Sequence, residues 1–367
     1  MTAFRLSMAT RLRQTPFTHR VETSGVTAYS VYNHMLLPSV FRSLEEDYWH
    51  LRSAVQLWDV SAERQVEIDG PDAFPLIQLT TPRDLSRMQN DQCCYIPVVD
   101  DHGRLQNDPV LVRLGATRFR ASLADSDLLL FYKGLASGLG MDVSVFEPDV
   151  SPLAVQGPLA NELVRNVFGE DTVRLRYFRH RRVSVAGTNM VISRSGWSRQ
   201  GGFEIYVEGS ENGEPLWDLL FEAGHDLDIR AGCPNYIERI SGGLLSYGND
   251  MTDEHTPFEA GLAKFCNLET PLCLGHRALV EQQEPSRMIR PIEILGEPVP
   301  EIRDRWMVAD EKGNPAGSIS STVWSPEFKT NVAIGMVDRH ANLPGSRIVV
   351  HAPDGEREAV IRDAFWL

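Results

Sequence analysis

The sequence lacks a surplus of positive charge. Its 36 lysine and arginine residues are outnumbered by 50 aspartate and glutamate residues, which gives a formal net charge of −14. Nucleic acids and anionic membranes are bound through basic surfaces, and the short basic run at positions 179–182 (RHRR) is typical of a solvated face. The charge therefore argues against nucleic-acid and membrane partners. It is compatible with a small zwitterionic or cationic substrate.

Metal-binding and nucleotide-binding motifs are absent as well. The five cysteines include no Cys-x-x-Cys pair, and no Cys/His cluster has zinc spacing, so we expect no metal cofactor. The sequence contains no Gly-x-Gly-x-x-Gly or Walker loop, no Gly-x-Ser-x-Gly and no His-Glu-x-x-His. This argues against the dinucleotide-binding, ATP-binding, serine-hydrolase and zinc-protease classes.

Long hydrophobic runs are missing too, and the first ten positions contain no apolar leader segment. Together with an odd number of cysteines, this suggests a cytoplasmic protein with reduced thiols. The length of 367 residues, with 42% hydrophobic and 23% charged residues, is typical of a globular enzyme with two or three domains. The composition leaves open whether the protein forms a homodimer.

Strand-like runs alternate with helical patterns over most of the chain, which predicts an α+β fold. Helices are expected at positions 72–79, 125–138, 215–223 and 236–247, and a hairpin at 95–99 and 110–114. After positions 284–286 (EPS) the pattern changes to six short strands separated by Gly, Pro and Asp turns, which predicts a small β-barrel. We therefore divide the chain into residues 1–284 and a barrel domain of residues 285–367.

The strongest chemical signal lies at positions 194–207 (RSGWSRQGGFEIYV). The pattern predicts a glycine-rich turn that leads into an alternating strand, so Glu204 and Tyr206 share one face of that strand. Trp197 lies across the turn. A carboxylate beside aromatic rings suits a flat, nitrogen-rich heterocycle, because the carboxylate accepts hydrogen bonds from ring N–H groups and aromatic faces stack on the ring.

This stretch resembles the Arg-[Ser/Thr]-Gly-[Tyr/Trp]-x-x-x-Gly-[Gly/Phe]-x-Glu block of the folate-binding aminomethyltransferase family, which includes the T-protein of the glycine cleavage system. Further blocks fit in the same order, at positions 106–109 (QNDP), 154–158 (AVQGP), 238–239 (ER), 247–250 (YGND) and 274–279 (LGHRAL). The resemblance spans nearly the whole chain. It implies two interlocked folate-binding subdomains within residues 1–284 and a C-terminal β-barrel, arranged as a ring with tetrahydrofolate in the central channel.

A closer resemblance is to the branch of that family that demethylates dimethylsulfoniopropionate (DMSP). It is carried by positions 11–18 (RLRQTPFT), 31–38 (VYNHMLLP), 47–51 (DYWHL) and 58–67 (WDVSAERQVE). It implies a tetrahydrofolate-dependent demethylase that moves a methyl group from the sulfonium to N5 of tetrahydrofolate. Three alternatives remain: a T-protein-like aminomethyltransferase with a lipoyl carrier protein as partner, a demethylase of another sulfonium or betaine, and a non-catalytic folate-binding protein.

The resemblance also implies roles for particular residues. Asp108 would be the catalytic residue that faces the reacting carbon, although an Asp before Pro also suits a turn in which it bonds its own backbone. Glu204 would bind the pterin ring together with Tyr95 and Trp197. Arg239 would hold the glutamate tail of folate bidentately, or else form a salt bridge on the helix surface.

The methyl donor needs groups that recognise both of its charges. The aromatic candidates for its cationic centre are Tyr32, Tyr95, Trp197 and Tyr206, because a sulfonium is attracted to the face of an electron-rich ring. The donor is expected to be a small zwitterion, so its carboxylate needs a cation. The candidates for that cation are Arg11, Arg13 and Arg20.

Overall fold

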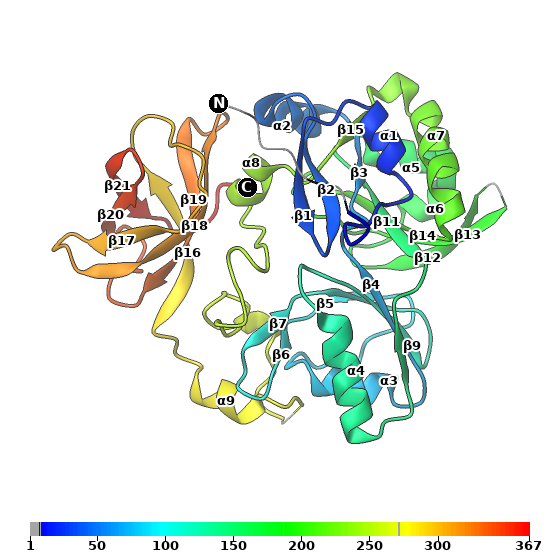
Figure 1. Cartoon of the computed structure of the whole chain (residues 1–367), viewed down its shortest axis with the longest axis horizontal. Coiled ribbons are helices and arrows are strands. Elements are labelled where there is room, and N and C mark those ends of the chain that lie inside the picture. The colour runs from blue at the N-terminus through cyan, green and yellow to red at the C-terminus, as the bar shows by residue number, and fades with distance from the viewer. Residues whose placement is uncertain (1–6, 8, 186, 271) are drawn as a thin grey trace.

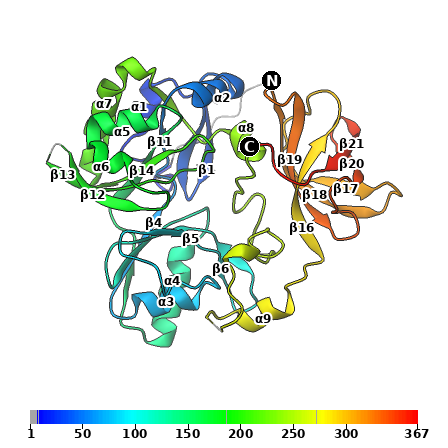
Figure 2. The same ribbon diagram turned by 180° about the vertical axis from the view of Figure 1, so that it is seen from behind.

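The computed structural model describes residues 7, 9–185, 187–270 and 272–367. Three lobes surround a central region (Figure 1). Two lobes each contain a β-sheet with helices, and the third, formed by the C-terminal part of the chain, is a closed β-barrel. Figure 2 shows from behind that helix α8 (Tyr236–Ser241) and the segment after it run between the lobes. The α+β prediction is confirmed.

The first lobe contains a six-stranded sheet in the order β12-β13-β14-β11-β3-β15. Neighbouring strands are antiparallel except for β15, which runs parallel to β3. Helices α1, α5 and α7 share one apolar core with this sheet. The bounds are β3 (Gln56–Asp59), β11 (Val150–Gln156), β12 (His180–Val185), β13 (Thr188–Ser193), β14 (Gly202–Glu208), β15 (Arg230–Gly232), α1 (Thr18–Thr23), α5 (Ala160–Phe168) and α7 (Gly213–Ala223).

The second lobe contains a five-stranded antiparallel sheet in the order β10-β4-β9-β8-β5. Helices α3 and α4 bury their apolar sides against it. The helix expected at 72–79 begins one residue later, at Ala73, and the side chain of Asp72 accepts from the backbone N–H of Asp142 and not from the helix. The bounds are β4 (Gln65–Asp69), β5 (Cys93–Tyr95), β8 (Val110–Arg113), β9 (Arg118–Ser122), β10 (Ser144–Phe146), α3 (Ala73–Leu79) and α4 (Leu128–Leu139).

The two sheets are interlocked along the chain. The chain leaves the first sheet after β3, builds the whole second sheet, and returns to the first sheet with β11. There β11 pairs with β3, so that Leu153 lies opposite Asp59 and Gln156 opposite Gln56. About 90 residues therefore separate two adjacent strands of one sheet. The short junction between β3 and β4, residues 60–64, crosses from one lobe to the other.

Six strands form the closed C-terminal barrel, in the order β16-β19-β18-β17-β20-β21, which confirms the predicted barrel. Alternate residues such as Ile292, Val308 and Val350 fill its core. The chain end returns to α8, where the backbone N–H of Trp366 donates to the Ser241 carbonyl at 2.8 Å. The bounds are β16 (Arg287–Ile294), β17 (Trp306–Asp310), β18 (Pro315–Ser325), β19 (Thr330–Asp338), β20 (Arg347–Ala352) and β21 (Gly355–Ile361).

Two predicted elements differ from the structure. The helix expected at 236–247 ends at Ser241, because two glycines follow and Gly243 adopts a φ of +64°. The expected hairpin at 95–99 and 110–114 forms two separate ladders, β5 with β8 and β6 with β7. The remaining elements are β1 (Ala28–Tyr32), β2 (Met35–Val40), β6 (Val98–Val99), β7 (Leu105–Asn107), α2 (Leu44–Ser53), α6 (Glu170–Val173) and α9 (His276–Glu281).

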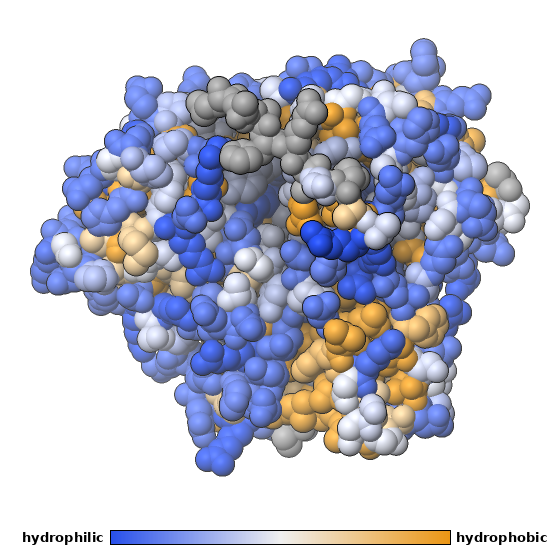
Figure 3. Space-filling model, viewed as in Figure 1, coloured by the Kyte–Doolittle hydropathy of each residue, from blue (hydrophilic) through white to orange (hydrophobic). Residues whose placement is uncertain are grey.

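The face seen in Figure 3 is mostly hydrophilic, with an apolar area over the lower lobe where α4 lies. Leu130 and Leu139 of this helix are 64% and 56% exposed. Within the described part of the chain, no helix combines the length and the apolar character that crossing a bilayer requires.

Candidate active site

A cavity of about 1040 Å³ lies where the two sheet lobes and the barrel meet. Its walls come from the hairpin β1–β2, the β3–β4 junction, the inner ends of β5, β9 and β14, helix α8 and barrel strand β18. Pockets for small molecules usually measure about 300–1,000 Å³. The space is therefore large enough for a large ligand together with a second, smaller one.

Asp108 lines this cavity from the turn between β7 and β8. Its Oδ2 accepts a hydrogen bond from the Tyr95 hydroxyl at 2.8 Å. Its Oδ1 is buried and, among the described residues, has no hydrogen-bond donor. Burial raises the pKa of the Asp108 carboxyl to about 7, although the bond from Tyr95 opposes the shift. A carboxyl with a free oxygen and this pKa can take up or release a proton near neutral pH.

Tyr95 is held firmly beside Asp108. Its carbonyl accepts from the Arg83 guanidinium at 2.6 Å, and its ring lies 5.1 Å from the ring of Phe265. Burial and the neighbouring Asp108 keep the pKa of Tyr95 well above its usual value, so its hydroxyl stays protonated and donates. Tyr95 therefore orients the Asp108 carboxyl and leaves Oδ1 for a ligand.

Glu204 on β14 is a second carboxylate at the cavity. It is 6% exposed, and its Oε2 accepts from the hydroxyl of Ser195. Burial raises the pKa of Glu204, and the bond from Ser195 opposes that shift. Ser195 belongs to the glycine-rich turn, and Trp197 of the same turn also lines the cavity. A carboxylate, a hydroxyl and an indole ring thus come from one turn and the strand that follows it.

Two glycines make this turn possible. Gly196 and Gly202 adopt φ values of +156° and +151°. A Cβ at Gly196 would come within 2.1 Å of the Gln156 side chain, and one at Gly202 within 2.2 Å of the Val155 carbonyl. Glycine is therefore required at both positions. The Gln156 side chain in turn fixes the loop, because the Ser198 hydroxyl donates to its Oε1 at 2.7 Å.

Glu63 is a third carboxylate at the cavity and is not among the residues predicted from the sequence. It lies in the β3–β4 junction, where its Oε2 accepts from the Ser122 hydroxyl at 3.1 Å, and Gln65 donates to the same hydroxyl at 2.8 Å. Burial and the negative charges of Glu204 and Asp108 raise the pKa of Glu63. Its one sequence signal is an acidic side chain in a very short junction between two buried strands.

Tyr206 does not line the cavity, so the structure does not bring it to the predicted donor site. It shares a face of β14 with Glu204, as predicted, but lies two residues further along the strand. There it packs with Cys93, Val112 and Val191 and is 1% exposed. Because β14 is buried on both faces, sharing a face with Glu204 does not mean sharing its ligand.

Arg239 lines the cavity from α8, but protein groups already engage it. Its guanidinium donates to Oδ2 of Asp250 at 2.8 Å and to the Ser321 hydroxyl at 2.6 Å, and lies 4.8 Å from the centre of the Tyr236 ring. The ion pair is buried, with the Arg239 and Asp250 side chains 6% and 0% exposed. Arg239 thus joins α8 to barrel strand β18 and does not form the helix-surface salt bridge. Its contact with a folate tail stays a prediction.

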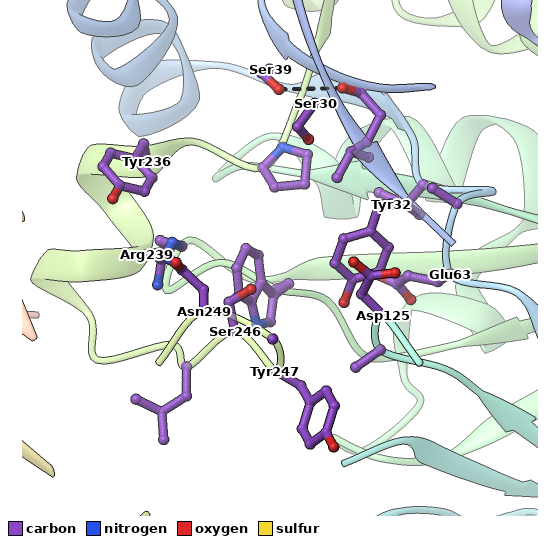
Figure 4. A pocket seen from close by; sticks show the side chains of 18 of the residues that line it. Ser30, Tyr32, Ser39, Glu63, Asp125, Tyr236, Arg239, Ser246, Tyr247 and Asn249 are labelled. Atoms are coloured by element: carbon purple, nitrogen blue, oxygen red, sulfur yellow. Dashed lines mark hydrogen bonds between the residues drawn. The ribbon is translucent and has the colours of Figure 1, made fainter. Parts of the chain in front are cut away.

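The two sides of the cavity differ in character (Figure 4). Tyr32, Glu63 and Asp125 lie together on one side, and Tyr236 and Arg239 lie on the other. Among the lining residues that the structure describes, only Arg239 carries a cationic side chain. The carboxylates of the lining are those of Glu63, Asp108, Asp125, Glu204 and Glu301.

The predicted candidates for holding the donor's carboxylate lie elsewhere. Arg13 pairs with Glu147 at 2.7 Å, and Arg20 pairs with Asp218 at 2.8 Å. Neither these two arginines nor Arg11 line the cavity. The structure therefore does not bring the three terminal arginines to the site.

The described ranges contain no cluster of metal-ligand residues and no thiol with a lowered pKa. No group of three or more His, Cys, Asp or Glu residues there could hold a metal ion. All five cysteines belong to the described part and are unpaired thiols. Burial raises the pKa of each thiol, which makes them poor nucleophiles.

Comparison with known families defines the class of protein. Residues 17–270, which make up more than half of the chain, match the family model of the GCVT N-terminal domain. The chain belongs to this family. The family resemblance carried by the sequence blocks is thereby confirmed.

Individual relatives match along almost the whole chain. The chain is 55% identical to the dimethylsulfoniopropionate demethylase DmdA of Ruegeria pomeroyi over 359 residues, which cover 97% of this chain and 98% of the relative. It is 27% identical to an aminomethyltransferase of Caldanaerobacter subterraneus subsp. tengcongensis, over 89% of this chain and 88% of that protein.

A solved structure shares the fold. The glycine cleavage system aminomethyltransferase T from Bartonella henselae matches with a TM-score of 0.86 at 21% identity, covering 97% of this chain and 98% of the other. This match confirms the predicted plan of two interlocked subdomains and a C-terminal barrel.

Proposed function

We propose that this protein is a tetrahydrofolate-dependent demethylase that transfers a methyl group from DMSP to N5 of tetrahydrofolate, giving 3-(methylthio)propanoate and 5-methyltetrahydrofolate. The observation that carries the proposal is the 55% identity to the Ruegeria pomeroyi demethylase along both whole chains. Family membership supports folate as the methyl acceptor. Cytoplasmic location and independence from metal ions are part of the proposal, as is the division into a folate-binding region, residues 1–284, and a barrel domain, residues 285–367.

The residues at the cavity fit a folate. Glu204 can accept from the N–H groups of the pterin ring, because a carboxylate has acceptor sites beyond the one that Ser195 uses. Trp197 offers an aromatic face close to it in the chain. Arg239 is our candidate for the glutamate tail, through guanidinium N–H groups beyond those bonded to Asp250, Ser321 and the Leu244 carbonyl.

Methyl transfer from a sulfonium needs positioning and charge compensation more than acid catalysis. The departing sulfur becomes a neutral thioether, so no residue has to protonate it. Positive charge moves to the accepting nitrogen, and one proton must then be removed. We assign both tasks to Asp108, whose free Oδ1 and pKa of about 7 suit charge stabilisation and proton acceptance.

Tyr32 and Trp197 are our candidates for the ring faces beside the sulfonium. Both line the cavity. Burial and the negative charges of Asp108 and Glu63 keep the pKa of Tyr32 well above its usual value, so the ring stays neutral. A neutral phenol ring near carboxylates is a favourable place for a cation.

The test is a donor panel with tetrahydrofolate: DMSP, other sulfonium compounds, betaines and an aminomethyl-lipoyl carrier protein. We expect 5-methyltetrahydrofolate with DMSP. If 5-methyltetrahydrofolate forms only with another sulfonium or betaine, that compound and not DMSP is the methyl donor. Ammonia release from the carrier protein would favour the aminomethyltransferase activity for which the 27%-identical relative is named. Folate binding without turnover of any donor would favour a non-catalytic protein.

A further inference from the structure

We propose that Glu63 makes the donor site selective for a cation, by placing its carboxylate beside the positively charged sulfur of the methyl donor. The inference deepens the proposed function and rests on it. It starts from an imbalance of charge, because the cavity carries five carboxylates and, among the described lining residues, one guanidinium. A cavity with this balance favours a cation near its acidic side.

The other four carboxylates are less suited to this role. Asp108 and Glu204 are our assigned contacts of the folate ring. Asp125 and Glu301 are exposed, so water and salt weaken their attraction for a bound cation. Glu63 is less exposed than Asp125 and Glu301 and has no other assigned partner in the reaction.

Glu63 also lies beside a ring that we assign to the donor. Tyr32 and Glu63 are on the same side of the cavity in Figure 4. The Ser122 hydroxyl donates to Oε2 of Glu63 at 3.1 Å, and no donor among the described residues contacts Oε1. Glu63 therefore offers a carboxylate oxygen next to an aromatic ring, and both groups attract a sulfonium.

The groups around Glu63 link donor binding to the loss of a proton from its carboxyl. The titratable groups around it include Glu204 and Tyr206 from β14, Asp108 from the β7–β8 turn, Tyr32 from β1, and Asp125, which lies on the same side of the cavity (Figure 4). Burial and the charges of Glu204 and Asp108 raise the pKa of Glu63, which favours the neutral acid at pH 7. A cation bound beside an acid lowers its pKa by about 1–3 units. The bound donor therefore converts Glu63 to the carboxylate, and the released proton goes to solvent.

The first experiment compares Glu63→Gln with the wild type for two ligands of one shape, of which only one carries a positive charge. DMSP has the sulfonium and a carboxylate, whereas 4-methylpentanoate keeps the carboxylate and has an uncharged CH group in place of the sulfonium. At saturating tetrahydrofolate, we expect Glu63→Gln to raise KM for DMSP about tenfold or more while Ki for 4-methylpentanoate changes less than about twofold. Glu162→Gln, at an exposed carboxylate of α5 outside the cavity, is the matched control and should change neither constant.

Calorimetry of DMSP binding in two buffers of different ionisation enthalpy gives an independent readout. At pH 7 the wild type should release up to about one proton per DMSP bound. Glu63→Gln should clearly reduce that release, and any remainder belongs to Asp108, whose pKa is about 7. Because 4-methylpentanoate lacks the positive charge, it should release no proton from either protein.

Two results would overturn the proposal. Equal loss of affinity for DMSP and 4-methylpentanoate would mean that Glu63 contributes shape and not charge. Weaker tetrahydrofolate binding with an unchanged KM for DMSP would place Glu63 in the folate site. Failure of the proposed function looks different, because the wild type itself would then not demethylate DMSP. Glu63→Gln and the wild type would then be compared with the sulfonium or betaine that the wild type does demethylate. If the wild type demethylates none, both proposals are wrong.

Discussion

Replacing Asp108 by asparagine separates the catalytic benefit of a buried carboxylate from its cost to the fold. Asp108→Asn keeps the shape of the side chain and an oxygen that accepts from the Tyr95 hydroxyl, but it removes the negative charge. We expect kcat to fall about 10²–10³-fold, as it does when a preorganised group that stabilises developing charge is removed. KM for the donor should change much less, because the charge on nitrogen exists only as the methyl group arrives.

The same substitution should stabilise the protein at alkaline pH. The pKa of Asp108 is about 7 in the folded protein, compared with an ordinary value of 3.8. Between these pH values the unfolded chain has already lost the proton that the folded protein keeps. The free energy of unfolding therefore falls as pH rises, and the whole cost is present above pH 7. About three pH units at about 1.36 kcal/mol each amount to at most about 4 kcal/mol.

The measurement is denaturant unfolding of both proteins from pH 5 to pH 8.5. The advantage of Asp108→Asn over the wild type should grow by about 2–3 kcal/mol across this range, because the variant has no carboxyl to titrate. The control is Asp84→Asn, since a bond of 2.9 Å from the Ser86 backbone N–H lowers the pKa of Asp84.

A lowered pKa stabilises the fold above the ordinary value, and that stabilisation is lost as pH falls. Asp84→Asn should therefore be less stable than the wild type by the same amount from pH 5 to pH 8.5, because the difference shrinks only below the ordinary value of 3.8. A stability difference for Asp108→Asn that does not depend on pH would refute the assigned burial cost. Wild-type kcat with DMSP would refute the catalytic role.

Further substitutions test the folate site, the link between α8 and the barrel, and the glycines. Glu204→Gln should weaken tetrahydrofolate binding by about 1.5–3 kcal/mol in calorimetry, because a charge-assisted hydrogen bond becomes a neutral one; unchanged affinity would contradict the assignment. Arg239→Met should lower the free energy of unfolding by about 3–5 kcal/mol, because it leaves the buried Asp250 carboxylate unpaired, and adding Asp250→Asn should recover most of the loss. Gly196→Ala should disrupt the turn above Gln156 and lower the thermal midpoint, whereas Gly138→Ala, in open space on α4, should raise stability by about 0.5–1 kcal/mol. Chelator treatment should leave DMSP turnover unchanged; activity that a divalent ion restores would contradict independence from metals.

Secondary-structure elements that follow from a local residue pattern were predictable from the sequence. The barrel strands and β14 follow from alternation between turn residues, and both are present. The helix at 236–247 was predicted too long because its apolar pattern outweighed the Gly242–Gly243 pair that ends it. The pairing of β3 with β11 depends on contacts between distant segments, which no local pattern encodes. The family resemblance implied only that the two subdomains are interlocked.

The candidate site also contains some residues that the sequence predicts and others that it does not. Asp108, Tyr95, Trp197 and Glu204 all reach the cavity, and their roles there stay predictions. Glu63 could not be found in this way, because it meets Glu204 only when the β3–β4 junction crosses to the edge of the second lobe. Tyr206, in contrast, was predicted at the site but does not line the cavity. Alternation along a strand identifies the face on which a side chain lies, but not whether a ligand or another lobe covers that face.

The interlocked sheets also have a consequence for how the protein is made. Both neighbours of β3, strands β11 and β15, come later in the chain, the nearer one by about 90 residues. A ribosome adds about 5–20 residues per second, so about 5–20 s pass between the synthesis of β3 and that of β11, its first partner strand. During that time Leu57 and Trp58, wholly buried in the finished protein, lie on an open strand edge that can pair wrongly. A truncated chain that stops before Val150 would keep that edge open permanently, which makes premature termination in the second lobe a source of aggregation.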